Sequence, residues 1–145
     1  MRARKPLWTC PACGRAFANA NQSHACGRHA LDGHFAGKPP LVRDIYDAFL
    51  AMLEEMGPVT VLPEKTRIAF QARISFAQLT VRRRWVLGHF VLARRLEDPL
   101  FSKVETISPR NHVHHFRLER VEQVDGLRGF AREAYAVGRQ EHLRS

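Results

Sequence analysis

The residues best suited to chemistry stand near the start of the chain, where all three cysteines fall within one short segment. Cys10 and Cys13 form a Cys-x-x-Cys pair followed by glycine, and Cys26 comes later, between His24 and His29. Two thiolates at this spacing can grip one metal ion, and the glycine allows a tight turn behind the second. An odd number of cysteines, with no apolar run after the basic N-terminus, disfavours a disulfide. The segment therefore predicts a tetrahedral Cys3His zinc site.

The fourth zinc ligand has two candidates. His24 and Cys26 stand two residues apart, so on an extended segment both side chains point the same way. Cys26 and His29 would instead form a second knuckle that mirrors the first. The spacing leaves both alternatives open. With four protein ligands the ion has no open position for water, so we expect structural Zn²⁺ that folds the segment and does no chemistry.

A second group of chemical side chains is the histidine-rich stretch 110–118. On a strand, His112 and His114 share one face, whereas His115 and Arg117 share the other. One interpretation makes His112 and His114 a metal or acid/base pair at a pocket. Another makes His115 and Arg117 an anion site. A third makes the imidazoles edge residues or hydrogen-bonded groups of the core.

The third group is a set of cationic side chains around the expected strands. Arg67 and Arg73 alternate with apolar residues, so a strand would place both on one side of a sheet. Guanidinium groups gathered there suit bidentate contacts with phosphate, and each contact would add to the salt dependence of binding. The predicted nucleic-acid or anion-binding residues are Lys65, Arg67, Arg82, Arg83, Arg84, Arg110, His115 and Arg117.

The composition agrees with a basic binding protein. The 145 residues carry a formal net charge of +9, and within residues 64–95 Glu64 is the only acidic residue. This distribution suits a polyanion such as DNA or RNA, although a solvated basic surface is the simpler alternative. No phosphate-binding loop, nucleophile elbow or His-Glu-x-x-His motif is present, so the sequence favours a binding protein and leaves an enzyme as an alternative without visible catalytic machinery. The longest apolar stretch, 86–93, is too short for a membrane, and we expect a cytoplasmic protein.

Hydrophobic periodicity predicts the elements that must position these residues. Apolar residues at helical spacing predict a helix over 41–56, which Gly57 and Pro58 end, and a second helix over about 121–143. Between them the period changes to that of strands, expected over 59–62, 67–73, 75–81, 85–93, 104–107 and 112–118. The sequence thus predicts an α+β fold. Its antiparallel meander of five or six strands is flanked by two helices, with a zinc-binding segment over 1–37 before the domain over 38–145.

Five motifs carry a resemblance to a known family. They are Trp8-Thr9-Cys10-Pro11-x-Cys13-Gly14, Asn21-Gln22-Ser23-His24-x-Cys26-Gly27, Phe35-x-Gly37-Lys38, Pro58-Val59-Thr60-Val61-x-Pro63-x-Lys65-Thr66-x-Ile68-Ala69-Phe70 and His114-His115-Phe116-Arg117-Leu118. Together they resemble bacterial proteins of the domain-of-unknown-function family 5655. The resemblance implies a small α+β domain with a helix-flanked antiparallel sheet and no established activity. It also implies His24 as the fourth zinc ligand, beside Cys10, Cys13 and Cys26, with His29 in reserve.

These observations lead to one expected function and two alternatives. We expect a small zinc-containing protein that binds nucleic acid or another polyanion through a basic sheet face. The first alternative is a small-ligand domain or enzyme with a pocket near Lys65, Arg67, His112 and His114. The second is a protein-interaction module that docks a partner through the zinc segment or through the face of the 41–56 helix that carries Asp44, Asp47, Glu54 and Glu55.

Overall fold

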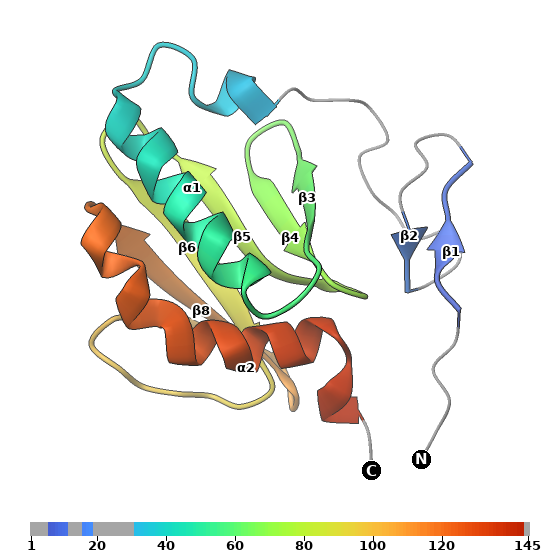
Figure 1. Ribbon diagram of the computed structural model, residues 1–145. Helices are drawn as coiled ribbons and strands as arrows, with labels where there is room; N and C mark the ends of the chain where they lie inside the picture. The colour runs from blue at the N-terminus through green and yellow to red at the C-terminus, as the bar shows by residue number, and fades with distance from the viewer. Residues whose placement is uncertain (1–5, 12–15, 19–30, 144–145) are drawn as a thin grey trace.

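Alternating apolar residues build a six-stranded antiparallel sheet, shown in Figure 1. The structure is a computed structural model that describes residues 6–11, 16–18 and 31–143. The strands of the sheet are β3 (Thr60–Pro63), β4 (Ile68–Gln71), β5 (Ser75–Val81), β6 (Val86–Leu92), β7 (Lys103–Ser108) and β8 (Asn111–Leu118). Every neighbouring pair is antiparallel. The α+β class and the six strands agree with the sequence prediction.

The order of the last two strands differs from the predicted meander. Neighbours in the sheet follow the order β3-β4-β5-β6-β8-β7, so β8 lies between β6 and β7. The burial patterns give the physical reason. Every second residue of β8 is buried, as an interior strand requires, whereas β7 is half-buried at best and suits an edge. The meander prediction is therefore wrong at this edge.

Two helices cover the same face of the sheet (Figure 1). The first, α1 (Pro40–Glu54), begins with proline, which loses no intrahelical hydrogen bond there. The second, α2 (Arg128–Gly138), is shorter than the predicted helix over 121–143, because the 3₁₀ turns η2 (Val121–Gln123) and η3 (Asp125–Leu127) precede it. Gly126 lies in η3 and weakens helix continuation. Gln140, with a positive φ of 62°, separates α2 from the turn η4 (Glu141–Leu143).

Aromatic side chains fill the space between the helices and the sheet. Phe49 of α1 packs against Phe90 of β6, with ring centroids 5.8 Å apart, and Phe90 packs against Phe116 of β8 at 4.9 Å. Gly88 of β6 makes room for this cluster. A Cβ at Gly88 would lie 2.6 Å from the Phe116 ring and 2.7 Å from Leu79. The centre of the sheet therefore depends on a residue without a side chain.

Among the described residues no helix lies on the opposite face of the sheet, but part of this face is covered by the N-terminal segment. Strands β1 (Trp8–Thr9) and β2 (Ala16–Phe17), which the sequence did not predict, pair with each other. Phe17 is buried against Leu62 of β3 and Ala69 of β4. The Gln71 amide donates a hydrogen bond to the Ala16 carbonyl. The hairpin thus packs on the β3–β4 end of the helix-free face.

A short connector links the N-terminal segment to α1. It contains η1 (Leu31–His34) and Lys38, whose ammonium group donates to the carbonyl oxygens of His34 at 2.7 Å and Val81 at 2.8 Å. These bonds fasten the connector to the end of β5. Across the described residues, no helix has the length and apolar character needed to cross a membrane.

Candidate nucleic-acid interface

The helix-free face over β5, β6, β8 and β7 is built from residues that alternate with the core. One row across this face runs from Gln78 through His89 and His115 to Lys103. Gln78, His89 and His115 are half-buried, and Lys103 is exposed. A second row joins Thr80, Leu87 and Arg117. Polar and cationic groups therefore occupy a surface that in β3 and β4 is covered by the N-terminal hairpin.

Two imidazoles meet at the centre of this face. The rings of His89 and His115 are edge to face, with centroids 5.4 Å apart. The Nε2 atom of His115 lies 2.7 Å from Oε1 of Glu105. An ionised carboxylate can only accept a hydrogen bond, so Nε2 of His115 carries the proton of this bond. The hydrogen bond from His115 and the nearby Lys103 ammonium lower the pKa of Glu105.

His89 is held in its neutral form at physiological pH. Burial lowers its pKa to about 4, and the charges of His115 and Arg67 act in the same direction. Arg67 is exposed at the start of β4, and its Nε atom is 2.9 Å from Oε1 of Glu64. The middle of the helix-free face therefore combines a neutral imidazole with flanking cations.

An aromatic residue and an arginine lie one row further along the face. The guanidinium carbon of Arg117 is 4.2 Å from the centroid of the Trp85 ring, a cation–π distance. Arg117 also pairs with Glu119, with Nε 2.8 Å from the carboxylate. Trp85 directly precedes the buried Val86, so it belongs to the helix-free side at the beginning of β6. This stacked pair marks the end of the sheet at the β5–β6 turn.

The structure brings most of the predicted basic residues to that end of the sheet. Strand pairing places the β3–β4 turn, the β5–β6 turn and the last residues of β8 together. The residues collected there are Lys65, Arg67, Arg82, Arg83, Arg84 and Arg117, with His115 one row further in. Arg110 instead lies in the β7–β8 turn, at the opposite end.

The cations at this end differ in how they are bound. Arg83 donates to the Gly37 carbonyl at 2.9 Å, so it serves partly to anchor the connector before α1. Lys65, Arg82 and Arg84 are exposed, and none of them forms an ion pair within residues 6–11, 16–18 and 31–143. These three are the cations with the most freedom to meet an external anion.

His112 and His114 lie on the helix-covered side of β8, with both ring nitrogens engaged. His112 contacts Oγ1 of Thr106 and the Pro109 carbonyl, each at 3.0 Å. His114 donates from Nδ1 to the His112 carbonyl at 3.0 Å and accepts the Leu96 N–H at 2.9 Å. Burial lowers the pKa of His114. The structure does not bring these histidines together with Lys65 and Arg67, which lie at the other end of the sheet.

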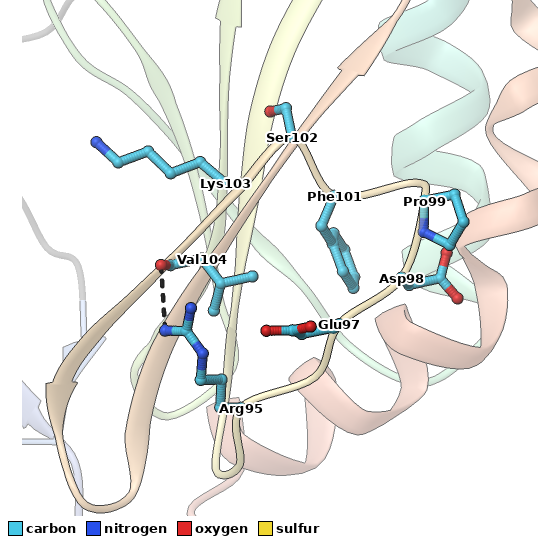
Figure 2. Close-up of a pocket in the computed structure, with 8 residues that line it drawn as sticks. All are labelled: Arg95, Glu97, Asp98, Pro99, Phe101, Ser102, Lys103 and Val104. Atoms are coloured by element: carbon cyan, nitrogen blue, oxygen red, sulfur yellow. Dashed lines mark hydrogen bonds between the residues drawn. The ribbon is translucent and has the colours of Figure 1, made fainter.

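A cavity of about 480 Å³ is lined by the loop between β6 and β7 and by the first residues of β7. Figure 2 shows Glu97 between Arg95 and Phe101, with its carboxylate turned inward, while Lys103 points away from them. Arg95 donates to the Val104 carbonyl at 3.3 Å, and the Phe101 ring packs on His114 at 4.9 Å. The cavity is lined by acidic and basic side chains alike, and none of the predicted site residues is among them.

The zinc prediction falls almost entirely outside the described residues. Of the five candidate ligands, Cys13, His24, Cys26 and His29 lie in the ranges that the structure does not describe. Cys10 is described and is buried directly after β1. The β1–β2 pairing brings Thr9 opposite Ala16, and the Cys10–Cys13 pair falls between these two residues in the sequence.

The sequence reasoning missed Trp85, His89 and Gln78 as members of this face. Alternation alone places Trp85 and His89 on the same side of β6, away from the buried Val86 and Phe90. This alternation could therefore have identified both residues. It could not have identified the neighbour of His89, because β6 pairs with β8 rather than with the next strand along the chain.

Comparisons with known proteins identify the family. Neither curated proteins nor solved structures gave a significant match to this chain. A family model does match, over residues 31–138, which span the connector, α1, the whole six-stranded sheet and α2. Because this match covers well over half of the sequence, the chain belongs to the family described as Domain of unknown function (DUF5655).

Proposed function

We propose that this protein binds single-stranded nucleic acid on the helix-free face of its sheet. The observation that carries the proposal is the gathering of Arg67, Arg82, Arg84 and Arg117 at one end of the sheet, where Arg117 stacks on Trp85. Phosphate contacts supply most of the affinity of a nucleic-acid binder, and cationic side chains provide them. The same cluster also offers an aromatic ring for a base.

The shape of the surface favours a single strand over a duplex. An open sheet face with an aromatic residue is a stacking platform, because every base presents a π face to it. Trp85 is half-buried and already stacks with a guanidinium group, so its ring is oriented before a ligand arrives. Stacking of one base on such a ring typically contributes about 1–3 kcal/mol.

Two of the arginines are already paired with carboxylates, which a bound phosphate would have to displace. Arg67 and Arg117 are paired with Glu64 and Glu119, so a phosphate must compete with a carboxylate for each of them. Both pairs are solvent-exposed, and such pairs contribute little to stability. Competition is therefore weak, and Lys65, Arg82 and Arg84 have no such competitor among the described residues.

The test is fluorescence anisotropy with a labelled single-stranded oligonucleotide, using the full chain at about 50 and about 200 mM salt. Arg84→Gln should weaken binding and reduce the salt slope by about 1. Arg110→Gln is the matched control, because it removes the same charge at the opposite end of the sheet. Trp85→Leu should weaken binding with an unchanged salt slope.

Three results would count against the proposal. They are the absence of binding at low salt, an affinity indifferent to salt, and equal losses in Arg84→Gln and Arg110→Gln. The last result would mean that net charge, and not this end of the sheet, determines binding.

We also infer that the N-terminal segment holds one structural zinc ion through Cys10, Cys13, His24 and Cys26. Support comes from the Cys-x-x-Cys spacing, which suits two thiolates on one ion, and from the β1–β2 pairing, whose residues Thr9 and Ala16 flank this pair in the sequence. Metal analysis of the purified full chain should find one zinc ion per chain. Cys13→Ser should lose it, and His24→Ala should lose more zinc than His29→Ala. Full zinc content in Cys13→Ser would refute the site, and the reverse order of the histidine variants would refute the assignment of His24.

A further inference from the structure

We propose that a phosphate of the bound strand sits over the His89–His115 pair and that binding adds a proton to His89. This inference rests on the proposed function and assigns a specific phosphate subsite to it. The supporting geometry is the direct pairing of the two histidines on neighbouring strands, with ring centroids 5.4 Å apart, at the centre of the helix-free face. The site adjoins the end of the face that carries Arg67 and Arg117.

Both imidazoles are accessible enough for an anion to reach them. The side chain of His115 is 33% exposed, and His89 is half-buried on the same surface. Neither ring belongs to the aromatic core, which lies on the other side of the sheet. A phosphate placed over the pair would also be within reach of Lys103, the exposed end of the same row.

The hydrogen-bonding state of the pair explains why a proton is needed. His115 donates the N–H of Nε2 to Glu105, so that donor is already engaged. Neutral His89 has a single N–H group. A phosphate offers only acceptor oxygens, so neutral His89 meets it with only one donor. Protonation turns both ring nitrogens of His89 into donors.

The charges around His89 come from three other elements. Arg67 at the start of β4 and His115 of β8 disfavour a proton on His89, whereas Glu105 of β7 favours one. Gln78, opposite on β5, is uncharged. Without a ligand, burial and the cations prevail and the pKa is about 4. A phosphate adds negative charge beside the ring and opposes both effects.

The test measures affinity against pH with an oligonucleotide that has no terminal phosphate, so that the probe itself does not titrate. If the phosphate restores the ordinary pKa of His89, affinity should rise about tenfold between about pH 7.5 and about pH 5.5. In His89→Gln the rise should fall below about threefold. His34→Gln is the control and should keep the full rise, because His34 lies in η1 and not on the sheet face.

A second measurement does not depend on a variant. Nuclear magnetic resonance of the wild-type imidazoles should show the pKa of His89 rising from about 4 to its ordinary value of 6.5 when the oligonucleotide is added. An unchanged His89 titration, or equal pH dependence in wild type and His89→Gln, would overturn the inference. If salt-dependent binding persists in that case, the proposed function stands without this subsite. If no oligonucleotide binds at either pH, both fail.

Discussion

His89 should make the folded protein sensitive to mild acid. Its pKa is about 4 in the folded chain and has the ordinary value of 6.5 when the chain is unfolded. The folded chain therefore binds this proton less tightly than the unfolded chain. The stability that neutral His89 allows is complete above pH 6.5 and is lost as the pH falls from 6.5 toward 4.

The magnitude follows from the two pKa values. At about pH 5 the unfolded imidazole is almost fully protonated and the folded one is mostly neutral, a difference of about 2 kcal/mol in the free energy of unfolding. His89 is half-buried, so screening by solvent reduces the effect, and we expect a loss of about 1–2 kcal/mol between about pH 7.5 and about pH 5. This is a large part of the stability of a small domain.

Urea unfolding followed by circular dichroism at both pH values measures this loss in wild type and in His89→Gln. The variant should lose less stability on acidification than wild type by about 1–2 kcal/mol. His114, whose pKa burial also lowers, is present in both proteins, so its acid sensitivity cancels in the comparison. Equal losses in the two proteins would show that His89 is not held neutral by the fold.

Three further predictions concern the packing and the charge of the sheet. Gly88→Ala should lower the free energy of unfolding by about 1–3 kcal/mol, because the added Cβ would meet Phe116 and Leu79. Gly33→Ala is the control and should not lower it, because the space around Gly33 is open. Equal melting temperatures of the two variants would contradict this prediction. Glu105→Gln removes a negative charge beside His115 and should raise oligonucleotide affinity about twofold to fivefold in the anisotropy assay. A fall in affinity would count against a phosphate near the His89–His115 pair. Phe17→Ala should cost about 3–5 kcal/mol if the N-terminal hairpin is an integral part of the fold, and an unchanged melting temperature would show that the hairpin contributes nothing to the sheet.

Local sequence patterns were sufficient for most of the elements. The helical spacing of Ile45, Phe49 and Leu53 predicted α1, and alternation predicted all six strands of the sheet to within a few residues. Alternation also separated the two faces of β8 correctly, with His114 buried and His115 on the helix-free side. These successes share a cause, because the face of a residue within one element depends only on its neighbours along the chain.

The N-terminal hairpin shows where local patterns fail. Strands β1 and β2 have two residues each, too few to show a period, and Phe17 is buried only because Leu62 and Ala69 lie beneath it. The sequence therefore suggested a boundary at residue 37 between the N-terminal segment and the α+β domain. In the structure the N-terminal segment and the sheet share a small core of their own, so they are packed together across that boundary.

The candidate site depends on which strand pairs with β6, and local sequence patterns do not determine that pairing. A simple meander would put β7 beside β6 and leave His89 two strands away from His115. Pairing of β6 with β8 instead brings the two imidazoles into contact and places Arg117 one row from them. The deciding property is burial, because β8 needs a neighbour on both sides while β7, with its exposed Ile107 and charged Lys103 and Glu105, tolerates an edge. The strand order that joins His89 and His115 on one surface thus follows from the burial of all the strands together, and the sequence of either strand alone does not predict it.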